Sequence, residues 1–433
     1  MHYYFVSRRS CYRLVVLITY TILNNDQTIR KADYQIENMP DLPVQKKGPQ
    51  NSSQIPKDDS TQVEMIKKIV RPPYNFICKN VIKLKYKTIL FRRSLSTKKF
   101  RRNDALYAFY DLDVMSAAFD IIPFLILAEK IRLFRGLKSL HVIIVPGSKQ
   151  GFAEGYFEYY RGMTPDKEKI RFAYLEWRVR NILVPCCWLM PSCKHLTVCM
   201  SRSEAREIEN LLAKHIFPDK YLVDFPINPN KNIYLMEVTP DNATVPGICA
   251  TQTACDFVHE WIDSNCKGKK VVTITLREST YEINRNSNIL AWMKFVRSLD
   301  QDKFFPVIIR DTEKEFQSIP KEMAGVTIFS EASWNIEIRA ALYQICYLNL
   351  FSSGGPMTLA WFNKKCRCLS FKLISDSPVA TEDHLKFLGY KVGDQLSYFS
   401  KFQKIVWHDD TYDVIKKEFE EMCLKIDSES DTA

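Results

Sequence analysis

The stretch Lys270-Val-Val-Thr-Ile-Thr-Leu276 decides the fold of this chain. It is an uninterrupted run of apolar and β-branched residues, which is typical of a central parallel strand covered on both faces. An amphipathic helix is predicted next, at 288–299, with Ile289, Trp292 and Val296 on one face. A buried strand followed by such a helix indicates a βαβ unit, and therefore a parallel sheet of the α/β class.

The same alternation continues on both sides of this unit. In the C-terminal half, strands are predicted at 305–310, 325–329, 347–351 and 366–373, and helices at 251–264, 334–345, 356–362 and 411–424. In the N-terminal half, strands are predicted at 106–110, 140–145, 196–200 and 221–225, and helices at 115–134, 170–183 and 201–215.

A linker-like stretch at 227–233 separates the two halves. We therefore predict an α/β protein with two Rossmann-like domains and parallel sheets, at 103–228 and 229–433, with a cleft between them. Residues 1–102 are predicted to be a basic, partly disordered arm, since 25–65 is polar and rich in Asn, Gln, Asp, Pro and Ser.

The composition excludes several classes of protein. Of 433 residues, 46% are hydrophobic and 26% are charged, which is ordinary for a folded domain and excludes collagen, coiled coil and wholesale disorder. The longest apolar run, Val15 to Leu23, is far shorter than the ~20 residues that a spanning helix needs. We expect neither a transmembrane helix nor a signal peptide.

The positive charge is concentrated in the arm. Residues 1–102 hold 21 Lys and Arg against 7 Asp and Glu, whereas the remaining chain is nearly neutral. A neutral body argues against nucleic acid as a partner. Residues 79–102 contain ten Lys and Arg and no acid, interleaved with apolar residues. This pattern fits an anionic membrane surface, a phosphate-bearing partner or a solvated basic tail.

The cysteines favour a reducing compartment. There are thirteen, an odd number, and no C-x-x-C pair occurs. Residues 186–199 gather Cys186, Cys187, Cys193, His195 and Cys199, but without the paired spacing of a zinc site. We expect buried reduced thiols, no metal and a cytoplasmic location.

The strongest candidate site is Leu350-Phe-Ser-Ser-Gly-Gly-Pro-Met-Thr-Leu-Ala-Trp-Phe362. An apolar strand ends in Ser and Gly, and Pro356 then falls at the first turn of a helix, where a missing N–H costs little. Glycines let the backbone approach a ligand closely. The N–H groups of Gly355, Met357 and Thr358 are expected to favour an anion such as a phosphate, and the alternative is a plain strand-to-helix turn.

This turn resembles the donor-site segment of GT-B glycosyltransferases, especially heptosyltransferase-like enzymes and uncharacterised bacterial glycosyltransferase-like proteins. The matching residues are Ser352, Ser353, Gly354, Gly355, Pro356, Met357 and Thr358. Thr358 stands where the family often has a histidine. The resemblance implies that the C-terminal half binds a nucleotide-sugar donor and the N-terminal half binds the acceptor, with no cofactor besides that substrate.

Other polar residues follow predicted strands of the C-terminal half. Arg277 closes the strand at 270–276 and Arg285 lies in the loop after it, so both are candidates for a diphosphate. The alternative is a surface pair with Glu278 and Glu282. Arg310 and Glu331 close later strands, and Glu331 is a candidate acceptor for a ribose hydroxyl.

The N-terminal half offers carboxylates that could take a proton from the acceptor. Asp113 and Asp120 are the candidates, and the alternative for Asp113 is a helix cap. Asp111-Leu-Asp113 also matches the metal-binding D-x-D motif of GT-A glycosyltransferases. Lys149, in the loop after the strand at 140–145, is a candidate for acceptor contact.

We therefore expect a metal-independent glycosyltransferase that moves a sugar from a nucleotide-sugar to a glycan, a lipid-linked or another acceptor in polysaccharide biosynthesis. It would be cytoplasmic and peripheral on a membrane through 79–102. The alternatives are a nucleotide-sugar epimerase on the same fold and a non-catalytic sugar- or nucleotide-binding protein.

Overall fold

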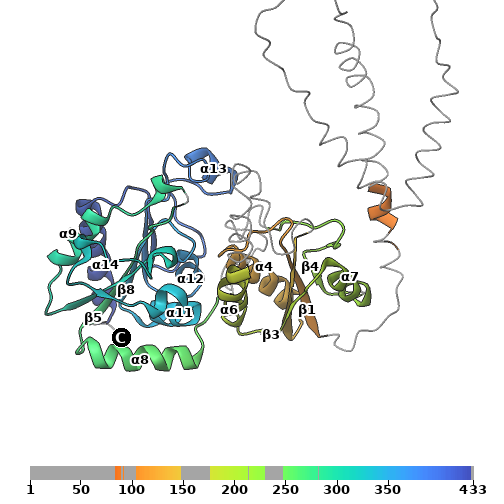
Figure 1. Cartoon of the computed structure of the whole chain (residues 1–433), viewed down its shortest axis with the longest axis horizontal. Helices are drawn as coiled ribbons and strands as arrows, with labels where there is room; N and C mark the ends of the chain where they lie inside the picture. The colour runs from red at the N-terminus through yellow and green to blue at the C-terminus, as the bar shows by residue number, and fades with distance from the viewer. Residues whose placement is uncertain are drawn as a thin grey trace, which may run out of the picture. The chain divides into compact units, whose positions relative to one another are not determined.

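The computed structural model describes residues 83–88, 91, 104–147, 176–212, 214–229, 247–280 and 282–430 (Figure 1). All of them belong to one compact unit, Asn80–Ala433. Most of the predicted arm therefore lies outside the described residues. Lys149 and the first part of the helix predicted at 170–183 lie outside them as well.

The first sheet has four parallel strands in the order β3-β2-β1-β4. They are β1 (Ala105–Asp111), β2 (Ser139–Val145), β3 (Cys193–Val198) and β4 (Ile216–Phe217). Its helices are α4 (Ile121–Phe134), α6 (Val184–Trp188), which continues a π-helical turn at Val179–Leu183, and α7 (Arg202–Leu211). Every residue of β1 is buried, because alternate side chains enter two separate cores. Leu106 packs in the core that contains α4, and Phe109 in the one that contains residues of α7.

Two predictions in this half are wrong in detail. The helix predicted at 115–134 begins only at Ile121, after a turn. Residues 221–225 form no strand; Leu222 and Phe225 make an isolated antiparallel bridge, and the fourth strand is β4. The apolar side chains of this segment cover the sheet instead of joining it: the ring of Tyr221 stacks on Phe109 with the centroids 4.7 Å apart.

The second sheet has six parallel strands in the order β10-β9-β8-β5-β6-β7. They are β5 (Lys270–Thr275), β6 (Phe304–Ile309), β7 (Thr327–Ile328), β8 (Leu348–Ser352), β9 (Cys368–Phe371) and β10 (Gln403–Val406). From the β7 side, the strands follow one another as 3-2-1-4-5-6, which is the order of dinucleotide-binding folds. All were predicted except β10, which was missed.

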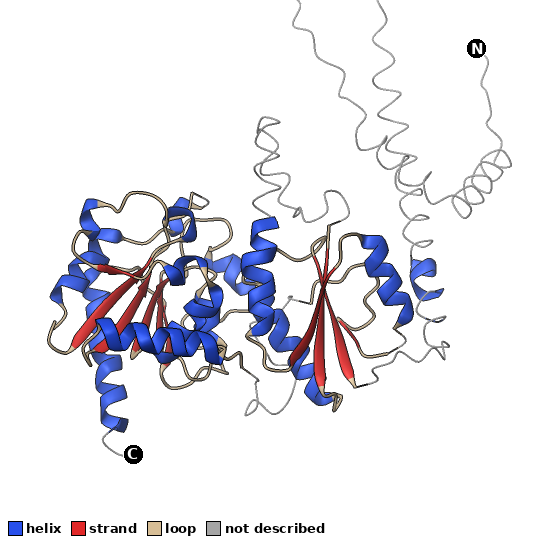
Figure 2. Cartoon of the chain, turned by 60° about the horizontal axis from the view of Figure 1, so that its bottom comes forward, coloured by secondary structure: helices blue, strands red, loops and turns tan. Residues whose placement is uncertain are grey.

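Helices flank both sheets in Figure 2. The helices of the second half are α8 (Gln252–Asn265), α9 (Ile289–Ser298), α10 (Glu331–Trp334), α11 (Ile336–Ile345), α12 (Met357–Trp361), α13 (Glu382–Phe387) and α14 (Tyr412–Ser430). Val272 and Ile274 of β5 pack in one core with residues of α9 and α14. Val271 packs in another, with residues of α8 and α11. The run 270–276 is therefore covered on both faces, as predicted for a central parallel strand.

Side-chain caps fix where the longer helices begin. Ser201, Thr251 and Asn288 each accept a hydrogen bond from a backbone N–H in the first turn of α7, α8 and α9. Such caps satisfy N–H groups that have no partner inside the helix.

The predicted fold class, α/β with two parallel Rossmann-like sheets, is confirmed. The limits predicted for the two domains, 103–228 and 229–433, stay predictions. Within the described ranges, no helix is both long enough and apolar enough to cross a bilayer.

Candidate functional site

The strongest candidate site lies at the carboxyl edge of the second sheet, between β5 and β8. These strands are the first and fourth along the chain, so strand order reverses there, and ligands of such sheets bind outside the carboxyl ends at that point. Thr275 pairs with Phe351 at the end of the ladder. The segments that begin at Leu276 and Ser352 therefore leave the sheet side by side.

The loop after β5 is closed on itself. The N–H of Arg277 donates to Ser287 Oγ at 2.8 Å, and the N–H of Ser287 donates back to the carbonyl of Arg277 at 3.0 Å. Ser279 and Asn286 make a second reciprocal pair, at 3.1 and 2.9 Å. The closed loop places Arg285 at the end of a 3-10 turn that spans Ile283–Arg285.

Arg285 reaches the turn after β8. Its Nη2 donates to Ser353 Oγ at 3.1 Å, across 68 residues of sequence. The structure thus brings together two segments that were singled out independently, the arginine loop and the Ser-Gly turn. Arg277 stands at the base of the same loop and is partly buried.

The turn itself is tightly packed. A Cβ atom on Gly355 would lie 2.6 Å from Cδ2 of Phe119, so no side chain fits there. A Cβ atom on Gly354 would make only ordinary van der Waals contacts. One expectation needs correction: the N–H groups of Met357 and Thr358 donate to the carbonyls of Gly354 and Gly355, at 3.3 and 3.1 Å. These hydrogen bonds stabilise the turn. The two N–H groups are therefore less available to bind an anion than expected. Pro356 immediately precedes α12, one position before the first-turn place predicted for it.

Asp410 is a site residue that the sequence analysis missed. It is 2% exposed, and its Oδ2 accepts hydrogen bonds from Ser352 Oγ at 3.0 Å, Trp292 Nε1 at 2.8 Å and the N–H of Asn288 at 2.9 Å. Lys372 Nζ lies 3.7 Å from its other oxygen. Asp410 therefore ties the end of β10 to the turn after β8, to the start of α9 and to the residue after β9.

Two other candidates of this half lie apart from Arg285 and Ser353. Arg310 is buried and forms a bidentate ion pair with Glu278, at 3.1 and 2.8 Å. Its Nε and Nη2 therefore already donate to a carboxylate. Glu331 opens α10, beyond β7, two strands away from β5. Within the described residues, no hydrogen bond joins Glu331 to Arg285 or Ser353.

In the first half, Arg202 occupies the D-x-D motif. Asp111 is 1% exposed, and its two oxygens accept from Arg202 at 2.7 and 3.0 Å and from the Tyr221 hydroxyl at 2.6 Å. Burial alone would lower the pKa of Arg202, but its hydrogen bond to Asp111 and the nearby negative charge outweigh this, so the pKa is raised. Asp111 thus has a permanent cationic partner, and the GT-A-type metal site is not assembled here.

Asp113 and Asp120 have different surroundings. Asp113 lies 3.1 Å from Arg202 and caps no helix, because α4 begins at Ile121. Asp120 immediately precedes α4 and accepts a hydrogen bond from Ser116 Oγ. Its neighbour Phe119 is the residue that packs against Gly355. Asp120 therefore directly follows a residue that contacts the Ser-Gly turn.

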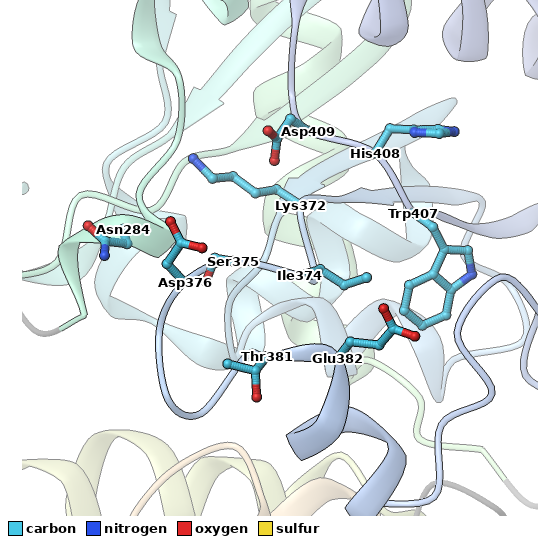
Figure 3. Close-up of a pocket in the computed structure, with 10 residues that line it drawn as sticks. All are labelled: Asn284, Lys372, Ile374, Ser375, Asp376, Thr381, Glu382, Trp407, His408 and Asp409. Carbon is cyan, nitrogen blue, oxygen red and sulfur yellow. The ribbon is translucent and has the colours of Figure 1, made fainter.

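A pocket of about 720 Å³ opens at the same edge of the second sheet, beyond β9 and β10 (Figure 3). Lys372, Ile374 and Asp376 line it from the loop after β9, and Trp407 and Asp409 from the segment after β10. Asn284 closes one side, and Thr381 and Glu382 at the start of α13 close another. The ring of His408 is directed away from the other labelled side chains in Figure 3.

The cysteines of the described ranges are free thiols, and ten of the eleven are buried. Burial raises the pKa of Cys193 to about 11 and that of Cys199 to about 12, so both are protonated at neutral pH. Cys186 and Cys187 lie in α6, and Cys193 lies in β3. Among the residues that the structure describes, no three His, Cys, Asp or Glu side chains are grouped as metal ligands.

Comparison with known proteins finds similarity in structure only. No family model matches the chain, and no curated protein matches its sequence. The chain is similar to the E. coli ADP-heptose LPS heptosyltransferase II, at 9% identity and a TM-score of 0.39, over 74% of this chain and 99% of that one. It is also similar to a family 9 glycosyltransferase from Veillonella parvula, at 10% identity and a TM-score of 0.37, over 75% and 91% of the two chains. A third similar structure is S. aureus MnaA with UDP, at 12% identity and a TM-score of 0.30, over 74% and 88%.

Proposed function

We propose that this protein is a glycosyltransferase that transfers a sugar from a nucleotide-sugar donor to an acceptor, without a bound metal ion. The observation that carries the proposal is the hydrogen bond from Arg285 to Ser353, which joins two loops at the point where strand order reverses. In sheets of this order, that point is where nucleotides bind.

The residues present suit the diphosphate of such a donor. A guanidinium forks onto phosphate oxygens and keeps its charge at all physiological pH values. Arg285 lies at the edge of the sheet beside Ser353, and Arg277 stands at the base of the same loop. As the bond to the sugar breaks, negative charge grows on the leaving diphosphate, and fixed arginines stabilise that charge without a metal.

Asp120 is the proposed general base. The acceptor hydroxyl must lose a proton as its oxygen attacks the sugar, and a carboxylate close to the donor can take it. Asp120 follows Phe119, which packs against Gly355 of the donor turn. Asp113 is less suited, because Arg202 already binds one of its oxygens. The first half would bind the acceptor, which we propose to be a glycan or a lipid-linked molecule of polysaccharide biosynthesis.

We further propose that the protein works in the cytoplasm, at the surface of a membrane. Reduced, buried thiols suit a reducing compartment. The ten Lys and Arg of 79–102, without an acid among them, would attract anionic lipid head groups.

Titration calorimetry with ADP, UDP, GDP and CDP on the full chain tests the donor site. We expect one of them to bind, and Arg285→Ala to weaken that binding about tenfold or more, as the loss of a charge-assisted hydrogen bond implies. Arg297→Ala is the matched control, because Arg297 is an exposed arginine of α9 that donates to the carbonyl of Glu322. Absence of binding by all four, to a protein shown to be folded, would remove the proposal.

Asp120→Asn separates catalysis from binding. It should retain the affinity for the nucleoside diphosphate and lose sugar transfer, because the amide cannot accept the proton. Transfer that continues at the wild-type rate would exclude Asp120 as the base while leaving the donor site in place.

A further inference from the structure

The pocket in Figure 3 touches the proposed diphosphate site through two of its walls. Asn284 precedes Arg285, which donates to Ser353. Lys372 lies 3.7 Å from Asp410, whose other oxygen accepts from the hydroxyl of Ser352 at 3.0 Å. In a nucleotide-sugar the transferred sugar is joined directly to the terminal phosphate. A cavity that adjoins the phosphate site is therefore within reach of that sugar.

We propose that this pocket holds the transferred sugar of the donor and selects a neutral or amino sugar over one that carries a carboxylate. The inference rests on the proposed function and adds the class of sugar to it. At about 720 Å³, the cavity lies within the usual range for small-molecule sites.

The lining provides both kinds of surface that a sugar ring needs. Trp407 and Ile374 contribute apolar area for the C–H face of a pyranose. The indole is fixed, because Trp407 Nε1 donates to the carbonyl of Asp394 at 2.9 Å. Ser375 and Thr381 add hydroxyls, which exchange hydrogen bonds with the hydroxyls of a sugar.

The charges of the lining set the selectivity. Asp376 and Asp409 are exposed carboxylates, and within the described residues neither has an ion-pair partner. The one ammonium, Lys372, donates to the carbonyl of Asn286 at 2.8 Å and lies near the buried Asp410, so its charge is largely compensated. Glu382 is paired with Lys386 at 2.7 Å. The two unpaired carboxylates accept from sugar hydroxyls or an ammonium and repel a uronate.

Saturation-transfer NMR on the full chain tests this with defined probes. The neutral probes are methyl α-D-glucopyranoside, methyl α-D-galactopyranoside and methyl α-D-mannopyranoside, and the acidic probe is methyl α-D-glucopyranosiduronate. Each is measured with and without the nucleoside diphosphate that binds best. We expect a neutral hexoside to bind about tenfold or more tightly than the uronate, since each carboxylate within about 4 Å contributes roughly a fivefold difference.

Two variants assign the effect to the pocket. Trp407→Ala should abolish the hexoside signal. The double variant Asp376→Asn, Asp409→Asn should bring the affinity for the uronate close to that for the hexoside; both side chains are exposed, so the fold is not at risk. Asp263→Asn, an exposed aspartate of α8 that does not line the pocket, should leave the ratio unchanged.

The outcomes separate this inference from the proposed function. Equal binding of the uronate and the hexosides by the wild-type protein overturns it, as does a hexoside signal that survives Trp407→Ala. The absence of any hexoside signal overturns it too, while leaving the donor site intact if a nucleoside diphosphate binds. Hexoside binding that depends on Trp407, in a protein that binds no nucleoside diphosphate, supports the pocket and rejects the glycosyltransferase.

Discussion

Arg202 shows how one largely buried side chain holds the edge of a sheet together. From the first turn of α7 it donates to Asp111 at the end of β1, to the carbonyl of Pro146 after β2 and to the carbonyl of Val223. Three separate segments therefore depend on one guanidinium. Removing it would leave the buried carboxylate of Asp111 without a cation, which strongly destabilises a folded protein.

We expect Arg202→Ala to lower the free energy of unfolding by about 3–5 kcal/mol, the range for breaking one side of a buried ion pair. Arg206, one turn further along the same helix, pairs with Asp224 at the surface, so Arg206→Ala should cost about 0–1 kcal/mol. Urea unfolding followed by circular dichroism measures both. Equal losses in the two variants would contradict the role assigned to Arg202.

The residues of the candidate site divide by how far the sequence could predict them. Arg277, Arg285 and the Ser352–Thr358 turn follow strands of strong apolar character, so their position at the sheet edge could be inferred. The bond between Arg285 and Ser353 could not, because it depends on how the loop after β5 closes on itself. Asp410 was missed because it follows β10, a short strand that the pattern did not show, and because its hydrogen-bond partners lie more than 50 residues away in the sequence.

Among the elements, α14 is attached to the sheet by charge as well as by apolar packing. Asp427 accepts from Lys270 Nζ at 2.7 Å, from the Tyr347 hydroxyl at 2.7 Å and from Lys303 Nζ at 3.3 Å. The hydrogen bond from Lys270 is the main reason why the pKa of Asp427 falls from its usual value of 3.8 to about 2. The C-terminal helix is thus held to β5 and its neighbours by an ionised carboxylate.

This gives α14 a definite dependence on pH. A lowered carboxyl pKa contributes stability that is fully present above about pH 4 and is lost as the pH falls through about 2. Wild type should therefore be more stable than Asp427→Asn at pH 6, and the difference should shrink between pH 4 and pH 2. Unfolding free energies of both proteins across this range provide the measurement. A difference that stays constant down to pH 2 would show that the carboxylate charge is not involved.

Element length decided which parts of the fold were predictable. The long periodic segments, such as α9, α11 and β5, were predicted to within a few residues. The two-residue strand β4 is too short to show periodicity, and tertiary contacts define it. The prediction of a strand at 221–225 was wrong because an apolar run that covers a sheet has the same composition as one that joins it.

At the scale of the whole molecule, the division of charge is the dominant feature. The 102 N-terminal residues carry a net charge of +14, and the remaining 331 carry −3. Charges of one sign near a surface of the other sign attract it over about one Debye length, which is about 8 Å at physiological salt. The arm, rather than the folded halves, should therefore govern binding to a charged membrane.

Cosedimentation with vesicles tests this. The full chain should bind vesicles that contain phosphatidylserine and not vesicles of phosphatidylcholine alone, with binding lost at high salt. Replacing Arg92, Arg93, Lys98 and Lys99 by Gln should weaken binding by up to about 4 kcal/mol. The control replaces four exposed lysines of the folded part, Lys364, Lys365, Lys416 and Lys417. If both quadruple variants lose the same affinity, net charge and not the arm is responsible.

The short strands at the sheet edges have a consequence for aggregation. Each sheet ends on one side in a strand of two residues, β4 in the first and β7 in the second. An edge strand can recruit a strand from another molecule only through its unpaired backbone groups, and two residues offer too few of them. The opposite edges, β3 and β10, are longer, at six and four residues. When the protein partly unfolds at high concentration, growth into cross-β assemblies should therefore begin from β3 and β10. A charged residue or a proline introduced in these two strands should improve solubility the most.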